Sequence, residues 1–431
     1  MSRQQQQHCH SKRTMLWNGP LAALALLVLA LATLAHAQVP AVANSRTQEV
    51  VTATQTSQQQ QKQQAGVNGT SCLSNTTAAG ATSTATLPPP LLIKTPAVPT
   101  MNVPMGPKAQ KDAIPTYIGE MTEETGFYQS IRLGEGNPVL YETQSDYQNI
   151  QVVQSQAYGK ILVLDGVVQL TERDADSYNE MMAHIPLFAH PNPQRVLVVG
   201  GGDGYVVSEV LKHASVQHVD HVDLDGGVIQ TCQEHFPWGQ AAWDDPRVHL
   251  HVADGAAFVR NAPANSYDVI IQDSSDPWTW ADDGSRVVLP SSVLYSTTHF
   301  SNLQRILKSN GILNLQAETL NIPSDLEGIR EWRQQATAVG FAQARYGSLM
   351  ISSYPTGQIG FLLCQNAPGP GASAESMEQR YQTMIATPEK ATTYYHPPLQ
   401  TSSFILPLWA EKYIYSDAVN GDEDERTAII A

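Results

Sequence analysis

Short apolar runs recur along the middle of the chain, and helix-length stretches separate them. Five of these runs are rich in Val, Ile and Leu and occupy residues 195–199, 216–224, 248–253, 267–272 and 311–316. Strands that are apolar along their whole length and alternate with helices are typical of a parallel sheet whose two faces are both covered. The pattern therefore predicts an α/β fold with a Rossmann-like domain over residues 185–365.

A shorter-period pattern precedes this domain. Apolar and polar residues alternate over residues 147–153 and 159–168, with turn signals at Tyr158-Gly159 and Asp165-Gly166. Alternation with a period of two, interrupted by turns, favours short antiparallel strands. We therefore predict a small N-terminal antiparallel β domain over residues 121–184.

The two flanking regions lack these patterns. Residues 38–120 are rich in Gln, Thr, Ala, Ser and Pro, and they have few apolar anchors to offset the entropy of ordering, so we expect a disordered low-complexity linker. Residues 366–431 contain a helical stretch and then the acidic end Asp422-Glu423-Asp424-Glu425. This region is expected to form a C-terminal helix followed by a solvated tail.

Residues 1–37 have the layout of a targeting segment. Lys12-Arg13 precedes an apolar run over residues 21–35, and the small-x-small sequence Ala35-His36-Ala37 follows. This layout indicates a secretory signal peptide, and the run also approaches the length of an uncleaved signal anchor. Either interpretation places the protein in the secretory pathway or on a membrane, with contact through residues 21–37. A transit peptide fits less well, and a misassigned start codon would leave a cytoplasmic protein.

Acidic residues dominate the rest of the chain. The 431 residues include 25 Lys and Arg against 40 Asp and Glu, a net charge of −15 at pH 7. Residues 1–120 contribute eight basic and three acidic residues, so residues 121–431 carry a net charge of −20. Such a body argues against a nucleic-acid partner, because phosphate binding needs basic surface, and it suits a cationic small molecule. The four cysteines are too scattered for a disulfide framework or a zinc site.

Glycines and carboxylates follow the first two predicted strands, at the edge where an α/β sheet binds its ligand. Gly200-Gly201-Gly202-Asp203-Gly204 allows a tight turn and a close ligand approach, although a plain strand-to-helix turn can look the same. Asp203 inside this loop suits a cationic or hydroxylated ligand rather than a pyrophosphate. Asp223 ends the second strand, where a carboxylate accepts hydrogen bonds from ribose hydroxyls, whereas Asp225 is placed to begin the next helix.

Two further strand ends carry carboxylates. Asp254-Gly255 follows the third strand and could reach an adenine amino group or simply cap a helix. Asp273 and Asp276 follow the fourth strand on a loop fixed by Pro277, which indicates either a reactive cleft or a capped turn with solvated acids. So many carboxylates around one cleft need a cationic partner. We therefore expect a sulfonium nucleoside together with a polyamine.

Five sequence blocks resemble, in the same order, the signature blocks of the spermidine synthases, which are polyamine aminopropyltransferases. The blocks occupy residues 147–150, 164–174, 200–204, 273–277 and 354–360. The resemblance covers residues 125–415 and implies a methyltransferase-type Rossmann-like domain behind a small β domain. It implies transfer of the aminopropyl group of the co-substrate decarboxylated S-adenosylmethionine to putrescine, giving spermidine and methylthioadenosine. It also implies a homo-dimer, with no metal and no prosthetic group.

The same resemblance implies a role for each matching residue. Asp273 falls on the general base that takes a proton from the attacking amine. The positions that contact the diamine are Gln169, Tyr178, Asp276 and Tyr354. The positions that bind the nucleoside co-substrate are Gln148, Asn179, Gly200, Gly202, Asp203, Gly204, Asp223, Asp254 and Gly255.

The chain departs from the family pattern at several positions. Asp223 stands where the family usually has Glu, Asn179 stands where it has Gln or His, and the loop over residues 278–286 is altered and lengthened. That loop normally helps to gate the active site, so a longer acceptor, spermidine, is an alternative that would give spermine or thermospermine. A tethered polyamine-binding module with weakened catalysis is a second alternative, and the presence of both Asp273 and Asp276 disfavours it. A methyltransferase is a third, which the acidic cleft disfavours.

Overall fold

The structure is a computed structural model that describes residues 117–122, 126–280, 286–369 and 371–416. The predicted leader over residues 1–37, most of the predicted linker and the acidic end of the chain lie outside these residues. The linker was predicted to run to residue 120, but β1 (Tyr117–Thr122) already pairs with β2 (Phe127–Arg132) in an antiparallel ladder. The composition of residues 117–120 does not predict a strand, but pairing with β2 orders them as part of β1.

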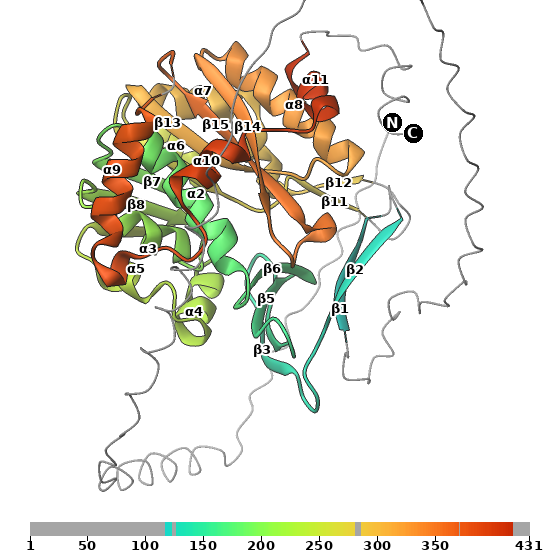
Figure 1. Ribbon diagram of the computed structural model, residues 1–431. Coiled ribbons are helices and arrows are strands. Elements are labelled where there is room, and N and C mark those ends of the chain that lie inside the picture. Colours follow the sequence, from blue (N-terminus) through green and yellow to red (C-terminus); the bar gives the residue numbers. More distant parts are fainter. Residues whose placement is uncertain (1–116, 123–125, 281–285, 370, 417–431) are drawn as a thin grey trace, which may run out of the picture. The chain divides into compact units, whose positions relative to one another are not determined.

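Seven strands form the central sheet, in the order β14-β15-β13-β10-β7-β8-β9 (Figure 1). Their bounds are β7 (Arg195–Gly200), β8 (His218–Asp223), β9 (Val248–Val252), β10 (Tyr267–Asp273), β13 (Leu307–Ala317), β14 (Gln343–Met350) and β15 (Gln358–Gln365). Strands β9, β8, β7, β10 and β13 are parallel, which confirms the predicted Rossmann-like arrangement. Strands β15 and β14 were not predicted, and they extend the β13 edge as an antiparallel pair, so the sheet is mixed.

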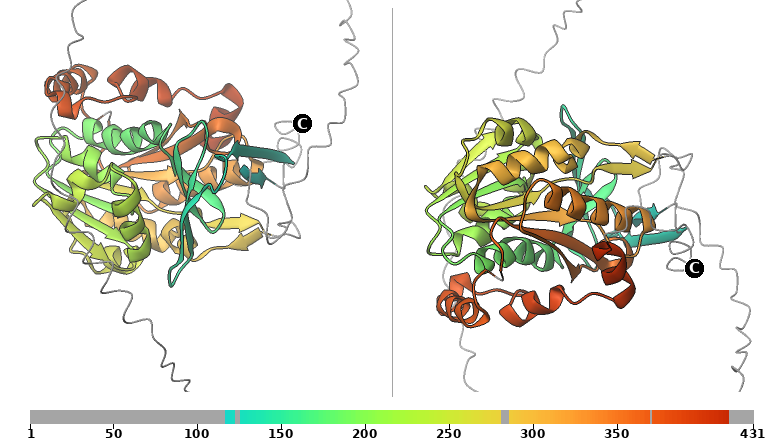
Figure 2. Two further views of the ribbon diagram at one scale, coloured as in Figure 1. Left: turned by 90° about the horizontal axis from the view of Figure 1, so that it is seen from below. Right: turned by 90° about the horizontal axis from the view of Figure 1, so that it is seen from above.

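Helices cover both faces of this sheet, as the two views of Figure 2 show. In the described residues they are α2 (Ala175–Ala189), α3 (Tyr205–Leu211), α4 (Gly226–His235), α5 (Gln240–Asp244), α6 (Gly255–Asn261), α7 (Thr297–Ile306), α8 (Pro323–Ala338), α9 (Ala374–Ile385), α10 (Pro397–Ser403) and α11 (Leu408–Tyr415). Val196 and Val198 of β7 belong to the core on the side of α2 and α3, whereas Leu197 and Val199 belong to the core on the side of α7 and α8. Burial of alternate side chains on opposite faces explains the unbroken apolar run over residues 196–199 of β7. Within the described ranges, no helix has the length and apolar character needed to cross a bilayer.

A second sheet, of four antiparallel strands, precedes α2. Its strands are β3 (Val139–Gln144), β4 (Asn149–Gln154), β5 (Lys160–Leu164) and β6 (Val167–Thr171), in that spatial order. The predicted turn at Asp165-Gly166 joins β5 to β6 with φ values of 49° and 86°, the left-handed pair that a two-residue hairpin needs. Ile150 of β4 packs with Val228 of α4, so this sheet forms one wall beside the central domain. The predicted boundary between the two domains, at residue 184, falls inside helix α2, which continues to Ala189. The buried side chains of α2 belong to the core of the central sheet.

The altered loop after Pro277 folds as a short β-hairpin. Strands β11 (Trp278–Trp280) and β12 (Arg286–Val288) pair antiparallel, and residues 281–285 between them lie outside the described residues. The N–H of Leu289 donates to the carbonyl oxygen of Pro277 over 3.0 Å and closes the base of the hairpin. The turn η1 (Pro290–Tyr295) follows, so the segment after β10 has a defined fold at its base.

The strand order reverses at β7, and this reversal brings two loops together. The chain passes outward from β7 to β8 and β9, and then returns across β7 to β10. Gly200 at the end of β7 is in register with Asp273 at the end of β10, and the N–H of Gly201 donates to the Asp273 carbonyl oxygen over 2.9 Å. Loops that diverge at such a reversal leave a crevice between them. The glycine loop and the Asp273 loop therefore border one crevice.

Gly200 is the position where this close approach leaves no room for a side chain. Its φ is 83°, and a Cβ placed there would lie 1.9 Å from the Asp273 carbonyl oxygen. We expect Gly200→Ala to lower the free energy of unfolding by about 1–2 kcal/mol for the left-handed conformation and by a further 1–3 kcal/mol, roughly, for the displaced backbone. Gly166→Ala is the matched control, because its φ is 86° but nothing lies within 4 Å of the added Cβ. Urea unfolding of the full chain measures both losses, and equal losses would contradict the close approach.

Candidate active site

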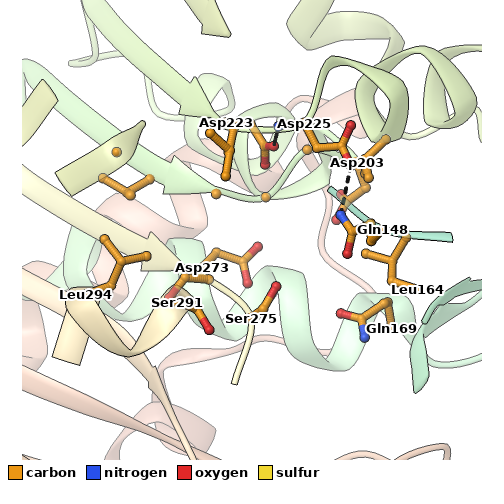
Figure 3. Close-up of a pocket in the computed structure, with 18 of the residues that line it drawn as sticks. Gln148, Leu164, Gln169, Asp203, Asp223, Asp225, Asp273, Ser275, Ser291 and Leu294 are labelled. Carbon is orange, nitrogen blue, oxygen red and sulfur yellow. Dashed lines mark hydrogen bonds between the residues drawn. The ribbon is translucent and has the colours of Figure 1, made fainter. Parts of the chain in front are cut away.

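A cavity of about 490 Å³ opens at the carboxyl ends of β7, β8 and β10. Gln148, Leu164 and Gln169 of the four-stranded sheet face it from one side, and Ser291 and Leu294 of η1 face it from another (Figure 3). The predicted site residues that line this cavity are Gln148, Gln169, Tyr178, Asn179, Gly200, Gly202, Asp203, Asp223, Asp254, Gly255, Asp273 and Tyr354. The topology thus gathers in one place nearly all the residues that the sequence pattern and the resemblance singled out.

A second cavity, of about 290 Å³, adjoins the first. The two cavities share the lining residues Gln169, Ser274, Ser275 and Tyr354. Asp276 lines only the second cavity, together with Glu318 and Asp325. The loop after β10 therefore presents Asp273 to the larger cavity and Asp276 to the smaller one.

Three carboxyl groups of the larger cavity are held largely out of water. Asp203 comes from the glycine loop, Asp223 from the end of β8, and Asp273 from the end of β10. Burial raises the pKa of Asp203 and of Asp223 to about 6. Burial, and then the charge of Asp203, raise the pKa of Asp273 to about 7. A cation that enters the cavity would lower these pKa values and drive the remaining protons off.

Two tyrosines stand beside Asp273. Tyr178 is a buried residue of α2, and its hydroxyl donates to Asp273 Oδ1 over 2.6 Å. Burial and the charge of Asp273 raise the pKa of Tyr178 well above its ordinary value, so its hydroxyl keeps its proton. The ring of Tyr354 lies 6.2 Å from that of Tyr178, centroid to centroid, and its hydroxyl donates to the Gln169 carbonyl oxygen over 2.5 Å. Because Tyr354 lines both cavities, the pair borders the passage between them.

Asp174 fixes the turn that carries Tyr354. One carboxyl oxygen accepts from the Ser352 hydroxyl and from the Ser353 N–H, each over 2.8 Å. The other oxygen accepts from the Thr171 hydroxyl over 2.6 Å and from the Ser353 hydroxyl over 3.1 Å. Asp174 also directly precedes α2. One carboxyl group therefore connects the segments that position both tyrosines.

The smaller cavity contains an acid that the sequence pattern did not single out. Glu318 follows β13, is only 8% exposed, and lines this cavity together with Asp276. Burial, and then the charges of Asp276 and Asp325, raise the pKa of Glu318 well above its ordinary value. The Gln316 amide donates to Asp276 Oδ1 over 3.3 Å and holds that carboxyl group in place. The rule that selected Asp223, a carboxylate directly after a parallel strand, would also have found Glu318.

Some predicted co-substrate residues already have partners within the protein. The Gln148 amide donates to Asp225 Oδ2 over 2.9 Å. Asp225 caps α4 by accepting from the Gly227 N–H, which confirms that it begins this helix. Asp254 caps α6 by accepting from the Ala256 N–H over 2.8 Å, and it lines the larger cavity as well. The helix-cap interpretation of Asp254 is therefore confirmed, and its contact with an adenine stays a prediction.

Asn179 and Gly204 occupy supporting positions. Asn179 lines the larger cavity, and its side-chain amide donates to the Ala175 carbonyl oxygen over 2.9 Å. Its Oδ1 accepts no hydrogen bond from the described residues. Gly204 lines neither cavity. Its φ is 75°, and a Cβ placed there would lie 2.5 Å from the Trp243 ring. The structure places Gly204 behind the glycine loop, where it lets the loop pack on Trp243, rather than at the cavity wall.

Comparisons with known proteins agree on one family. Residues 175–372 match the family model of the spermine/spermidine synthase domain, and residues 126–172 match that of the spermidine synthase tetramerisation domain. The chain is similar to spermidine synthase 1 of Hyoscyamus niger, with 38% identity over 282 residues that cover 64% of this chain and 84% of the relative. It is also similar to spermidine synthase 2 of Arabidopsis thaliana, with 35% identity over 319 residues that cover 72% and 88%.

Solved structures give the same result. The crystal structure of a spermidine synthase in complex with the transition-state analogue AdoDATO has a TM-score of 0.61 and 28% identity, and the match covers 69% of this chain and 94% of that chain. The spermidine synthase from Thermotoga maritima has a TM-score of 0.60 and 28% identity, with the same coverage.

Asp223 offers a test of the raised pKa values. Its pKa is about 6 in the folded chain and about 3.9 in an unfolded one, so the folded state binds more protons and stability falls as the pH rises between these values. Asp223→Asn keeps an acceptor for the Asp225 N–H, which donates over 2.8 Å. We expect this variant to have a free energy of unfolding about 1–2 kcal/mol above that of the wild type at pH 8. This gain is smaller than the full equivalent of the pKa difference, because solvent in the open cavity screens the side chain. Urea unfolding should show no such gain at pH 4, and an equal effect at both pH values would contradict the assignment.

Proposed function

Since the chain belongs to the spermidine synthase family of transferases, we propose that it moves the aminopropyl group of decarboxylated S-adenosylmethionine to putrescine, giving spermidine and methylthioadenosine. The observation that carries this proposal is the pair of acidic cavities that meet at the Asp273 loop. The larger cavity would take the co-substrate and the smaller one the acceptor. Asp273 would then stand between the two reacting groups.

The larger cavity suits a sulfonium nucleoside. Asp223 at the end of β8 would accept from the ribose hydroxyls, and Asp254 after β9 would face the adenine, since both line this cavity. Asp203 and Asp273 add negative charge for the sulfonium and the aminopropyl ammonium. Ordinary S-adenosylmethionine carries a carboxylate as well, and like charges repel strongly where water is scarce. The cavity therefore favours the decarboxylated compound.

Asp273 is the group that we assign as the general base. The amines of putrescine have pKa values near 10.4, the approximate lysine value, so the attacking amine must lose a proton before its lone pair can react. A base with a pKa of about 7 is suited to this transfer at neutral pH, and the Tyr178 hydroxyl holds it in place. The new N–C bond forms as the C–S bond breaks, and the electron pair of the C–S bond goes to sulfur. The amine proton goes to Asp273, and methylthioadenosine leaves as a neutral thioether.

The smaller cavity suits the far ammonium of the diamine. Asp276 and Glu318 both line it, and burial raises the pKa of each carboxyl group, so a bound ammonium would stabilise their ionised forms. Gln169 and Tyr354 line both cavities and would lie along the methylene chain. A diamine held at both ends points its attacking nitrogen at the methylene carbon, and positioning of this kind is a large part of catalysis in transfer reactions.

The reaction itself is tested with the full chain and decarboxylated S-adenosylmethionine. Methylthioadenosine release with putrescine as acceptor is the expected result. A strong preference for spermidine would move the proposal to spermine or thermospermine synthesis. Polyamine binding without release would favour the tethered binding module instead.

We further propose that the chain is a homo-oligomer. The family model matched by residues 126–172 is described as a tetramerisation domain, whereas the resemblance implied a homo-dimer. Leu140 on β3 is a large apolar side chain that is 46% exposed in this region. A single exposed apolar side chain is common on protein surfaces, so the assignment rests on the family model and Leu140 serves as its probe. The β domain is therefore the region that we assign to contacts between copies.

Oligomerisation is tested by light scattering. We expect the full chain to have a mass that is a multiple of its 46.9 kDa. Leu140→Glu places a charge in the assigned region and should lower this mass. Gln379→Glu is the control, because Gln379 is an exposed polar residue of α9 and lies outside the β domain. A monomeric wild type, or an unchanged mass for Leu140→Glu, would contradict the assignment.

The role of Asp273 is tested by Asp273→Asn. This variant keeps the shape of the side chain and an acceptor for the Tyr178 hydroxyl but cannot take the amine proton. We expect kcat to fall by at least about 100-fold, while the affinity for methylthioadenosine, measured by calorimetry, stays close to that of the wild type. Asp244→Asn, an exposed residue of α5, is the matched control for the charge change. A variant rate equal to that of the wild type would remove Asp273 from this role.

A further inference from the structure

Trp278 is an aromatic residue of the smaller cavity, which Asp273 does not line. Trp278, Ile322 and Asp325 line the smaller cavity but not the larger one, whereas Ser274 and Ser275 line both. An acceptor with one amine at Asp273 and its other end in the smaller cavity would share that cavity with the indole of Trp278.

The indole is fixed in this position by α8. The rings of Trp278 and Trp332 lie 5.6 Å apart, centroid to centroid, and Tyr295 packs on Trp332 at 4.6 Å. A Cβ placed on Gly328 of α8 would lie only 2.7 Å from the Trp278 ring, so the helix admits the indole because residue 328 is glycine. The hydrogen bond from Leu289 to Pro277 fixes the hairpin base from the other side. Trp278 is therefore a packed part of the cavity wall.

The same cavity contains the paired carboxyl groups of Asp276 and Glu318. An ammonium that reaches them lies in a space also lined by an aromatic face, to which a cation is attracted. Trp278 and the two acids line the same cavity, so the indole occupies space that a longer acceptor with a third amine could otherwise fill.

We infer that Trp278 is a specificity-determining residue, which fills part of the acceptor cavity and thereby selects a diamine over a triamine. This inference rests on the proposed function. It concerns the hairpin of β11 and β12, the segment in which this chain departs from the pattern of the family that it resembles.

The inference is tested by kcat/KM for putrescine and for spermidine in the full chain, with methylthioadenosine release as the readout. Trp278→Leu shortens the wall, so we expect the spermidine-to-putrescine ratio of kcat/KM to rise about 10-fold or more, the size of effect that pocket volume gives. Trp278→Phe keeps an aromatic face and opens less space, so its ratio should rise less. Trp409→Leu is the control, since Trp409 is on α11 and lines neither cavity.

The outcomes separate this inference from the proposed function. An unchanged ratio in folded, active Trp278→Leu overturns the role of Trp278 and leaves the proposed function standing. If Trp278→Leu does not fold, an unchanged ratio in Trp278→Phe overturns it in the same way. A wild type that uses spermidine as well as putrescine also overturns it, whereas a wild type that releases no methylthioadenosine with either amine overturns both proposals.

Discussion

Burial of negative charge at one edge of a sheet is the constraint on which this site depends. Asp203, Asp223 and Asp273 line one cavity, and burial raises their pKa values to about 6 or 7. Without a cationic ligand, these carboxyl groups destabilise the folded chain as the pH rises, because each must either keep a proton or remain ionised without a partner. A ligand with a sulfonium and an ammonium removes this penalty. The affinity for a cation and the protons bound by the site are thus two aspects of one interaction.

The topology of the sheet makes this crowding unavoidable. The three acids lie on loops that follow β7, β8 and β10, and these strands are neighbours because the order reverses at β7. The register of Gly200 with Asp273 brings two of the loops into backbone contact. Gly200 permits that contact because it has no Cβ. The backbone contact and the closeness of the acids therefore both follow from the register of β7 with β10. The β domain lines the larger cavity through Gln148, Leu164 and Gln169, and the hairpin lines the smaller one through Trp278.

Much of this arrangement could be predicted from the sequence, because apolar runs mark buried strands and the residues after them must meet at one edge. The antiparallel pair β14 and β15 was missed, since a buried apolar run has no mark of strand direction. A glycine-rich motif does not reveal which glycine faces a ligand and which, like Gly204, faces Trp243. The contact of Trp278 with Trp332 joins segments far apart in the chain and leaves no periodicity to detect. Glu318 followed the same rule as Asp223 and could have been found.

The central claim is that a cation, and not a nucleoside alone, displaces protons from this cavity. Titration calorimetry at pH 6, repeated in buffers with different ionisation enthalpies, counts the protons released on binding. Decarboxylated S-adenosylmethionine should release more than about half a proton per chain, and neutral methylthioadenosine should release far less. Equal proton counts for the two ligands would contradict the account.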